Sequence, residues 1–125
     1  MSRPDVLRIF ETCVRSGAQE ILLLTGKPPI CRFPDTIRDL AIAPLTGEDV
    51  TFLAIESLAP DLRDWYDRAG FCRFDYRYRH GAGTRFRVFV IRHGESHFAT
   101  LTPLAPDVPE LEYGGSQNAK SEWLN

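Results

Sequence analysis

The sequence has little of what marks a membrane or secreted protein. No apolar run exceeds four residues, as in Ile-Leu-Leu-Leu at positions 21–24, whereas a membrane-spanning helix needs about 20. Met1 is followed by a polar stretch rather than by the apolar core of a secretory signal. We therefore expect a cytoplasmic protein that does not insert into membranes.

The sequence is also poor in cysteine. Its three cysteines, Cys13, Cys31 and Cys72, are an odd number at wide, irregular spacing. Such spacing is neither a disulfide framework nor a zinc pattern, and it favours small core residues in a reducing compartment. The histidines His80 and His93 could lie close together beside Cys72, but no spacing here requires a metal. We expect no metal and no cofactor.

Motifs of catalysis are missing as well. The 125 residues contain neither the phosphate-binding Gly-x-x-x-x-Gly-Lys-Ser/Thr nor the nucleophile elbow Gly-x-Ser-x-Gly. No residue is predicted to be catalytic, and we expect a binding protein rather than an enzyme. His97 is expected to be a strand residue whose ring is hydrogen-bonded.

Charge is small overall but uneven. The net charge is −2, and residues 107–125 alone carry −3. After Pro106 the sequence loses periodicity and becomes rich in polar residues and glycine, which is typical of a flexible tail. We predict one domain over residues 1–105 and a flexible acidic tail over 106–125, in which Trp123 and Leu124 could form a docking motif. The near-neutral body lacks the basic footprint of a nucleic-acid-binding protein, so we do not expect nucleic acid as its partner.

Periodicity predicts an α+β domain. Apolar residues at helical spacing predict helices over residues 4–16, from Thr46 to Leu58, and over 61–69, with Gly70 as the cap of the last. Alternating or short apolar runs predict six strands: 21–24, 30–33, 36–41, 72–79, one through Phe86, Val88 and Val90, and 97–101, ended by Pro103. The order α-β-β-β-α-α-β-β-β predicts a two-layer domain with three helices against an antiparallel sheet of about six strands.

The strand pair over residues 72–91 carries the leading candidate surface. Period-two alternation sets its polar face apart from its buried face, and arginine suits carboxylates and phosphates because its planar fork donates two parallel hydrogen bonds. Two apolar residues share this polar face, which indicates either an interface or a helix that covers that end of the sheet. The interaction candidates are Arg73, Arg77, Arg79, Arg85, Arg87, Phe89 and Ile91. A solvated face that only keeps the protein soluble is the alternative.

A second candidate region lies on the helices. Leu53, Trp65 and Tyr66 could line a ligand pocket between helices and sheet, although their helical spacing equally fits core residues. A small-ligand sensor therefore remains an alternative function, as does a module that binds nucleotide or nucleic acid through the arginine-rich hairpin.

Three local motifs resemble a known family. Residues 17–32 read Gly-Ala-Gln-Glu-Ile-Leu-Leu-Leu-Thr-Gly-Lys-Pro-Pro-Ile-Cys-Arg, residues 71–76 read Phe-Cys-Arg-Phe-Asp-Tyr, and residues 84–88 read Thr-Arg-Phe-Arg-Val. Together they resemble the N-terminal domain of the type II/type IV secretion ATPases, especially the twitching-motility (pilus-retraction) branch. The resemblance covers residues 4–105 and implies a PAS-like fold.

The resemblance also identifies two positions at which this sequence differs from the family. The family has an arginine where this sequence has Ala99 and a histidine where it has Leu22. In the family this domain packs against the ATPase domain of a neighbouring subunit, and its arginines face the nucleotide there; Arg85 and Arg87 match that region. We therefore expect a non-catalytic interaction or regulatory module whose partner is a protein, either a secretion or pilus motor ATPase or a second copy of itself.

Overall fold

The computed structural model describes residues 3–56, 58–77 and 85–104, so the predicted tail and Arg79 lie outside the described residues. The elements are α1 (Arg3–Arg15), β1 (Glu20–Leu24), β2 (Ile30–Arg32), β3 (Ile37–Asp39), α2 (Gly47–Thr51), the π-helix η1 (Phe52–Glu56), the 3₁₀ helix η2 (Pro60–Leu62), α3 (Arg63–Ala69), β4 (Phe71–Arg77), β5 (Arg85–His93) and β6 (Ser96–Leu104). Three α-helices and six strands occur in the predicted order, which confirms the α+β fold class. No helix among the described residues is long and apolar enough to cross a membrane.

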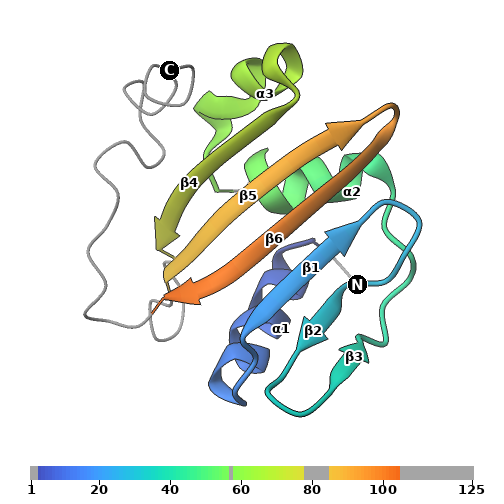
Figure 1. Cartoon of the computed structure of the whole chain (residues 1–125), viewed down its shortest axis with the longest axis vertical. Coiled ribbons are helices and arrows are strands. Elements are labelled where there is room, and N and C mark those ends of the chain that lie inside the picture. The colour runs from blue at the N-terminus through green and yellow to red at the C-terminus, as the bar shows by residue number, and fades with distance from the viewer. Residues whose placement is uncertain (1–2, 57, 78–84, 105–125) are drawn as a thin grey trace.

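The six strands form one antiparallel sheet in the order β3-β2-β1-β6-β5-β4. The last strand, β6, lies in the middle, where Leu101 pairs with Ile21 of β1 on one side and with Val88 of β5 on the other. Two meanders from opposite halves of the chain are thereby joined into one surface. Figure 1 looks onto this surface, with α1 and α2 behind the sheet.

The helices cover one face of the sheet. Side chains alternate between the two faces of a strand, and those that point toward the helices are buried. The buried apolar residues of the strands are Ile21, Leu23, Cys31, Cys72, Phe74, Phe86, Val88, Val90, Ala99 and Leu101. Phe10 of α1, Leu53 of η1 and Tyr66 of α3 pack against them in one continuous core. The predicted alternation of Cys72 and Phe74 with Arg73 and Asp75 is confirmed.

Two predicted boundaries were wrong. The strand expected to end at Pro103 continues to Leu104, and Pro103 pairs with Phe86. This position lies beyond the last pair between β6 and β1, where β6 has only one neighbouring strand and a missing amide hydrogen is tolerated. The strand predicted over 36–41 is reduced to β3. The Leu40 amide still donates across to the Pro29 carbonyl, but the Ile42 amide donates to the Leu40 carbonyl in a turn.

The helix predicted from Thr46 to Leu58 is not a regular α-helix. Only Gly47–Thr51 is α-helical, and a π-helix follows at Phe52–Glu56. At the junction the Thr51 hydroxyl donates to the carbonyls of Gly47 and Glu48. A hydroxyl that bonds back to helix carbonyls in this way often bends or loosens the helix, and π-helices occur mostly as single turns inside α-helices.

The start of α2 depends on a capping box. The Thr46 hydroxyl accepts from the Asp49 amide at 3.0 Å, and the Thr46 amide donates to the Asp49 carboxylate at 2.9 Å. We expect Thr46→Ala to lower the free energy of unfolding by about 1 kcal/mol, measured by urea denaturation. Thr46→Ser keeps the hydroxyl and should retain most of the stability; equal losses in both variants would show that the cap is unimportant.

Candidate functional site

The face of the sheet away from the helices is the candidate site, and we call it the open face. No described helix covers it (Figure 1). Cross-strand pairing sets its side chains in rows, because residues directly opposite in neighbouring strands point to the same side. One row, the apolar row, crosses four strands from β1 to β4. Its members are Leu24, Phe98, Ile91 and Phe71.

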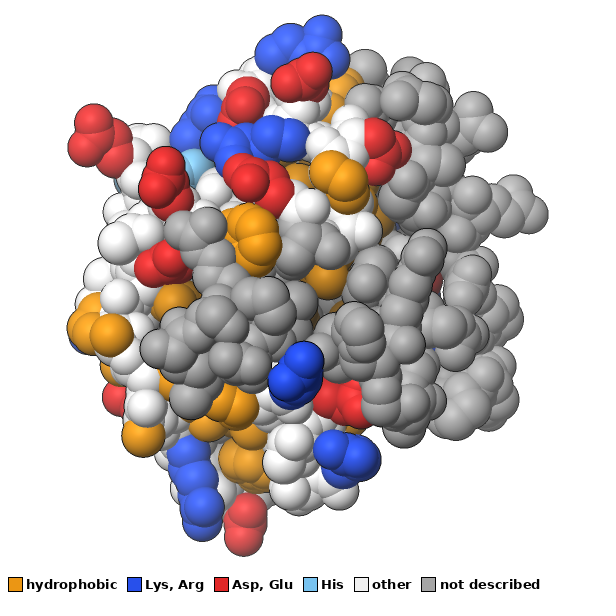
Figure 2. Space-filling model, turned by 180° about the vertical axis from the view of Figure 1, so that it is seen from behind, with side chains coloured by type: hydrophobic (Ala, Val, Ile, Leu, Met, Phe, Trp, Pro, Cys, Tyr) orange, Lys and Arg blue, Asp and Glu red, His pale blue; other side chains and the backbone are white. Residues whose placement is uncertain are grey.

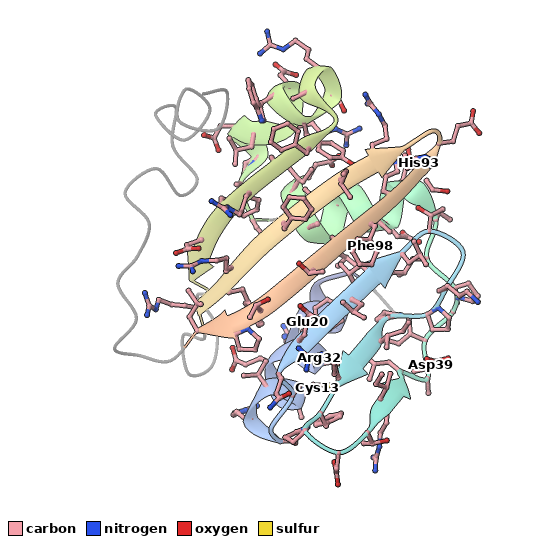
Figure 3. The ribbon with its side chains drawn as sticks, viewed as in Figure 1. Cys13, Glu20, Arg32, Asp39, His93 and Phe98 are labelled. Atoms are coloured by element: carbon pink, nitrogen blue, oxygen red, sulfur yellow. The ribbon has the colours of Figure 1, made fainter. Side chains whose placement is uncertain are left out.

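The apolar row is partly open to solvent. Ile91 near its middle is 40% exposed, and the other three side chains are half-buried. The neighbouring row continues the apolar character with Ile30, Leu22 and Phe89, interrupted by Thr100. Figure 3 labels Phe98 on β6, one of the two central strands of the sheet. A row of large apolar side chains across a sheet face that no described helix covers is typical of an interface.

Charged side chains gather at the other end of the open face. Arg87 of β5 forms a bidentate ion pair with Asp75 of β4, at 2.9 Å from Nε to Oδ1 and 3.1 Å from the second guanidinium nitrogen to Oδ2. The Asp75 side chain is only 5% exposed, against 34% for Arg87. On the other half of the sheet, Arg32 lies 3.5 Å from Glu20 and donates to Gln19. The open face therefore changes from apolar to charged along the strands.

The structure brings most of the predicted interaction residues together. Arg73, Arg85, Arg87, Phe89 and Ile91 share the open face by register, and the backbone of Arg77 pairs with Arg85. These residues differ in their exposure to solvent. Arg85 is 94% buried, with 6% of its surface exposed, and Arg73 is exposed.

Sequence reasoning missed the residues from the other meander. Leu22, Leu24 and Phe98 belong to the open face, yet the sequence predicted only that residues 21–24 form a short apolar strand. Only Ile21 and Leu23 of that run are buried. The sequence did carry a signal for this. A strand with one solvated face normally alternates apolar and polar residues, whereas this run is apolar at every position.

The predicted pocket residues lie in the core. Leu53, Trp65 and Tyr66 are exposed by 1%, 7% and 0%, as their helical spacing allowed. A hollow of about 260 Å³ formed by described residues lies elsewhere, lined by Ser16, Phe33, Pro34, Asp35, Thr36 and Arg38. The core gives no support to the sensor alternative.

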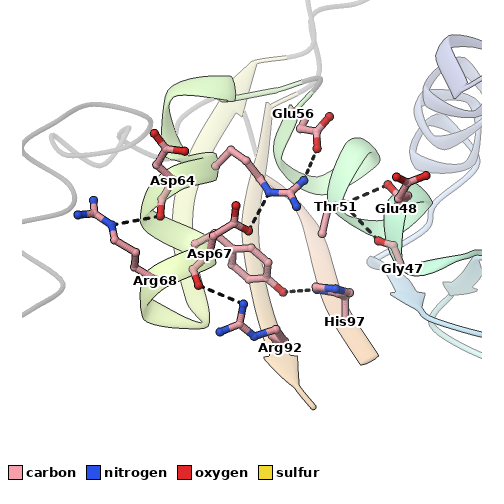
Figure 4. Close-up of polar contacts among 11 residues, drawn as sticks. Gly47, Glu48, Thr51, Glu56, Asp64, Asp67, Arg68, Arg92 and His97 are labelled. Atoms are coloured by element: carbon pink, nitrogen blue, oxygen red, sulfur yellow. Dashed lines mark hydrogen bonds and ion pairs between the residues drawn. The ribbon is translucent and has the colours of Figure 1, made fainter. Parts of the chain in front are cut away.

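Tyr66 and His97 form a polar contact inside the core (Figure 4). The Tyr66 hydroxyl lies 2.6 Å from His97 Nδ1. Burial raises the pKa of Tyr66 to about 12, so the phenol stays protonated and can donate a hydrogen bond to the neutral ring. The backbone of His97 is held by Thr25, whose hydroxyl accepts from the His97 amide at 2.9 Å. These contacts join α3, β6 and the end of β1, and the ring is hydrogen-bonded as predicted.

The surroundings of His97 make stability depend on pH. Burial lowers the pKa of His97 below its usual 6.5, and Arg63 and Arg92 lower it further while Asp67 opposes them. As the pH falls, His97 therefore binds a proton more readily in the unfolded chain than in the folded chain. The contribution of His97 to the free energy of unfolding is full above about pH 6.5 and falls as the pH drops toward the folded-state pKa. We expect His97→Gln to flatten this part of the stability profile in urea denaturation between pH 7 and pH 5. An unchanged slope would assign the dependence to other groups.

Several other charged groups are held in ion pairs and hydrogen bonds beside Tyr66 and His97. Arg63 pairs with both Glu56 and Asp67, and Arg92 donates to the backbone of Asp67 (Figure 4). Figure 2 views the molecule from behind and shows acidic and basic side chains interspersed there. Within the described ranges, no group of three histidine, cysteine or acidic side chains is placed to hold a metal ion, and His80 lies outside them.

Comparison with known proteins connects this fold to motor ATPases. No protein-family model matches the sequence, and no curated protein sequence matches it significantly. Solved structures that share the fold include two motor ATPases. The Legionella pneumophila ATPase DotB superimposes with a TM-score of 0.71 over 87% of the chain at 18% identity, and the pilus retraction motor PilT with 0.68 over 84% at 33% identity.

The fold, together with 33% identity to PilT over 84% of the chain, shows that the chain is similar to part of a type IV secretion or pilus ATPase, as an N-terminal domain would be. By sequence it is more similar to the pilus retraction motor PilT than to DotB. The chain spans about 30% of the length of each, 31% for DotB and 30% for PilT. The resemblance identified from the sequence motifs is confirmed.

Proposed function

We propose that the chain is a non-catalytic docking module that binds a partner protein through the open face, with a secretion or pilus motor ATPase as the partner. The apolar row of Leu24, Phe98, Ile91 and Phe71 is the observation that carries this proposal. Burying a large apolar side chain contributes roughly 1.5–3 kcal/mol. A partner that covers the half-exposed row would gain part of that free energy at each position.

The charged end of the open face favours a protein over a nucleotide. The bidentate pair uses two guanidinium nitrogens of Arg87 on the Asp75 carboxylate, and a phosphate would have to compete with that carboxylate. Ala99, at the position where the family has an arginine, is fully buried on the helix side of the sheet. A polar margin beside an apolar centre is the usual composition of a protein interface. A cytoplasmic location remains a prediction from the sequence.

The proposal is tested by light scattering during size-exclusion chromatography. The full chain is run alone, with a purified motor ATPase of the pilus-retraction type from the same organism, and with both that ATPase and ADP. We expect a complex whose mass equals that of the ATPase plus one or more copies of the chain, with or without ADP. A chain that elutes separately from the ATPase contradicts this partner. If the chain alone forms a dimer, the partner is a second copy of the chain instead of the ATPase. Binding that needs ADP would favour the nucleotide alternative.

A further inference from the structure

The edge of the sheet at β3 is exposed to solvent. β3 is the outermost strand on its side of the sheet, and all three of its residues are exposed. Ile37 is 64% exposed, more than any other large apolar side chain of the described residues. Figure 3 labels Asp39 at this edge. A strand edge with accessible backbone groups is a template on which another strand can pair.

The hydrogen bonds between β2 and β3 determine which backbone groups face outward. The Phe33 amide donates to the Thr36 carbonyl at 2.8 Å, and the Thr36 amide donates to the Phe33 carbonyl at 3.4 Å. In an antiparallel pair, such bonded positions alternate with positions whose N–H and C=O groups point away from the neighbouring strand. Ile37 and Asp39 therefore direct their backbone groups outward from the sheet, whereas Arg38 is bonded to β2.

The side chains along this edge alternate between the two sides of the sheet. Arg38 pairs with the buried Cys31, so it lies on the helix side, while Ile37 and Asp39 lie on the side of the open face. The guanidinium carbon of Arg38 stands 5.9 Å from the centre of the Phe33 ring. Both side chains line the hollow of about 260 Å³. The ring face attracts the cation and holds it beside the outer edge of β3.

We propose that the β3 edge binds an extended segment of a partner protein as an added antiparallel strand, with an acidic residue opposite Arg38. The outward N–H and C=O groups of Ile37 and Asp39 supply the main-chain hydrogen bonds, and the alternating side chains supply the specificity. Opposite charges in directly opposed residues stabilise strand pairing. The segment therefore carries a basic residue opposite Asp39, then the acidic residue, then an apolar residue opposite Ile37.

A second copy of the chain does not match this edge. If two β3 strands pair about Arg38, the two arginines stand directly opposite each other. If they pair about Ile37, Asp39 stands opposite Asp35 of the second copy. Like charges in directly opposed residues destabilise strand pairing. The charges along the edge therefore favour a different chain, whose segment is complementary to β3.

The test titrates the isotope-labelled full chain with the synthetic peptide Thr-Val-Lys-Glu-Val-Thr-Val and follows amide hydrogen exchange by NMR. We expect the amides of Ile37 and Asp39 to exchange rapidly in the free chain and to become protected in the complex. The Arg38 amide, already bonded to β2, should change little. A peptide with lysine in place of its glutamate should bind about 10-fold more weakly, because it loses a charge-assisted hydrogen bond.

Variants of the chain separate the backbone from the side-chain contribution. Ile37→Pro removes one outward amide and no bond to β2, so it should weaken binding of the first peptide by at least about 10-fold. Arg38→Glu should reverse the preference between the two peptides. Arg68→Glu is the matched control: it makes the same charge change at an exposed position of α3 and should leave binding unchanged. Circular dichroism checks that each variant folds.

Three outcomes would overturn the proposal. They are that neither peptide binds, that both peptides bind equally well, or that the protected amides lie outside β3. If Ile37→Pro does not fold, Arg38→Glu alone decides between a strand added at this edge and binding elsewhere. None of these outcomes depends on whether the chain docks on an ATPase, because the apolar row of the open face does not include β3.

Discussion

Replacing Phe74 by alanine is expected to lower the free energy of unfolding by about 4 kcal/mol, the typical cost of emptying a fully buried aromatic site. Phe74 is the middle residue of β4, is fully buried on the helix side and pairs with Val88. Because the core is continuous from α1 to α3, the cavity would open at its centre. Urea denaturation followed by circular dichroism measures the loss.

The matched control is another phenylalanine of the same strand. Phe71 lies on the open face, half-buried, with its ring 6.3 Å from that of Trp65. Phe71→Ala should cost less than half as much as Phe74→Ala, because the ring is already in contact with solvent. Equal losses at both positions would mean that the sheet is covered on both faces and that no open face exists.

The second large effect concerns binding. Ile91→Glu is expected to weaken the complex with the motor ATPase by about 10- to 100-fold, the range typical of a central interface residue. Ile91 is 40% exposed near the middle of the apolar row. A carboxylate there would have to lose its water on docking without gaining a partner. Isothermal titration calorimetry measures the change, and the stability of the free chain should change little.

Thr12→Glu supplies the matched control. Thr12 is exposed on α1, behind the sheet, and the substitution adds the same charge. It should leave the affinity unchanged. If both variants weaken binding equally, the effect is one of net charge. If only Thr12→Glu weakens it, the helix side carries the interface instead of the open face.

Much of the fold was predictable because local periodicity is strong. The alternation of Cys72 and Phe74 with Arg73 and Asp75 requires a strand with one covered face, whatever its neighbours are. Gly70 ends α3 in the left-handed conformation, at φ 80°, as a glycine after a helix indicates. The π-helix at Phe52–Glu56 was not predictable, because it depends on a hydroxyl that competes for backbone carbonyls rather than on the apolar pattern.

The candidate site was only half predictable for a related reason. Period-two alternation places Phe89 and Ile91 on one face with Arg87, and this needs no knowledge of the sheet. The apolar row also needs Leu24 and Phe98, which join it only because β6 lies between β1 and β5. That strand order connects residues about 70 positions apart, and no local pattern records it. The pairing of Arg87 with Asp75 likewise depends on the register of β4 against β5.

Hydroxyl-radical footprinting of the chain with and without the motor ATPase tests the docking surface most directly. The docking proposal predicts that oxidation falls on complex formation at the half-buried open-face aromatics Phe71, Phe89 and Phe98. Phe33 and Phe52, which are similarly half-buried but do not belong to the rows of the open face, serve as references and should oxidise at the same rate in both samples. Protection of the two references with no change at Phe71, Phe89 and Phe98 would contradict the proposal that the open face binds the partner.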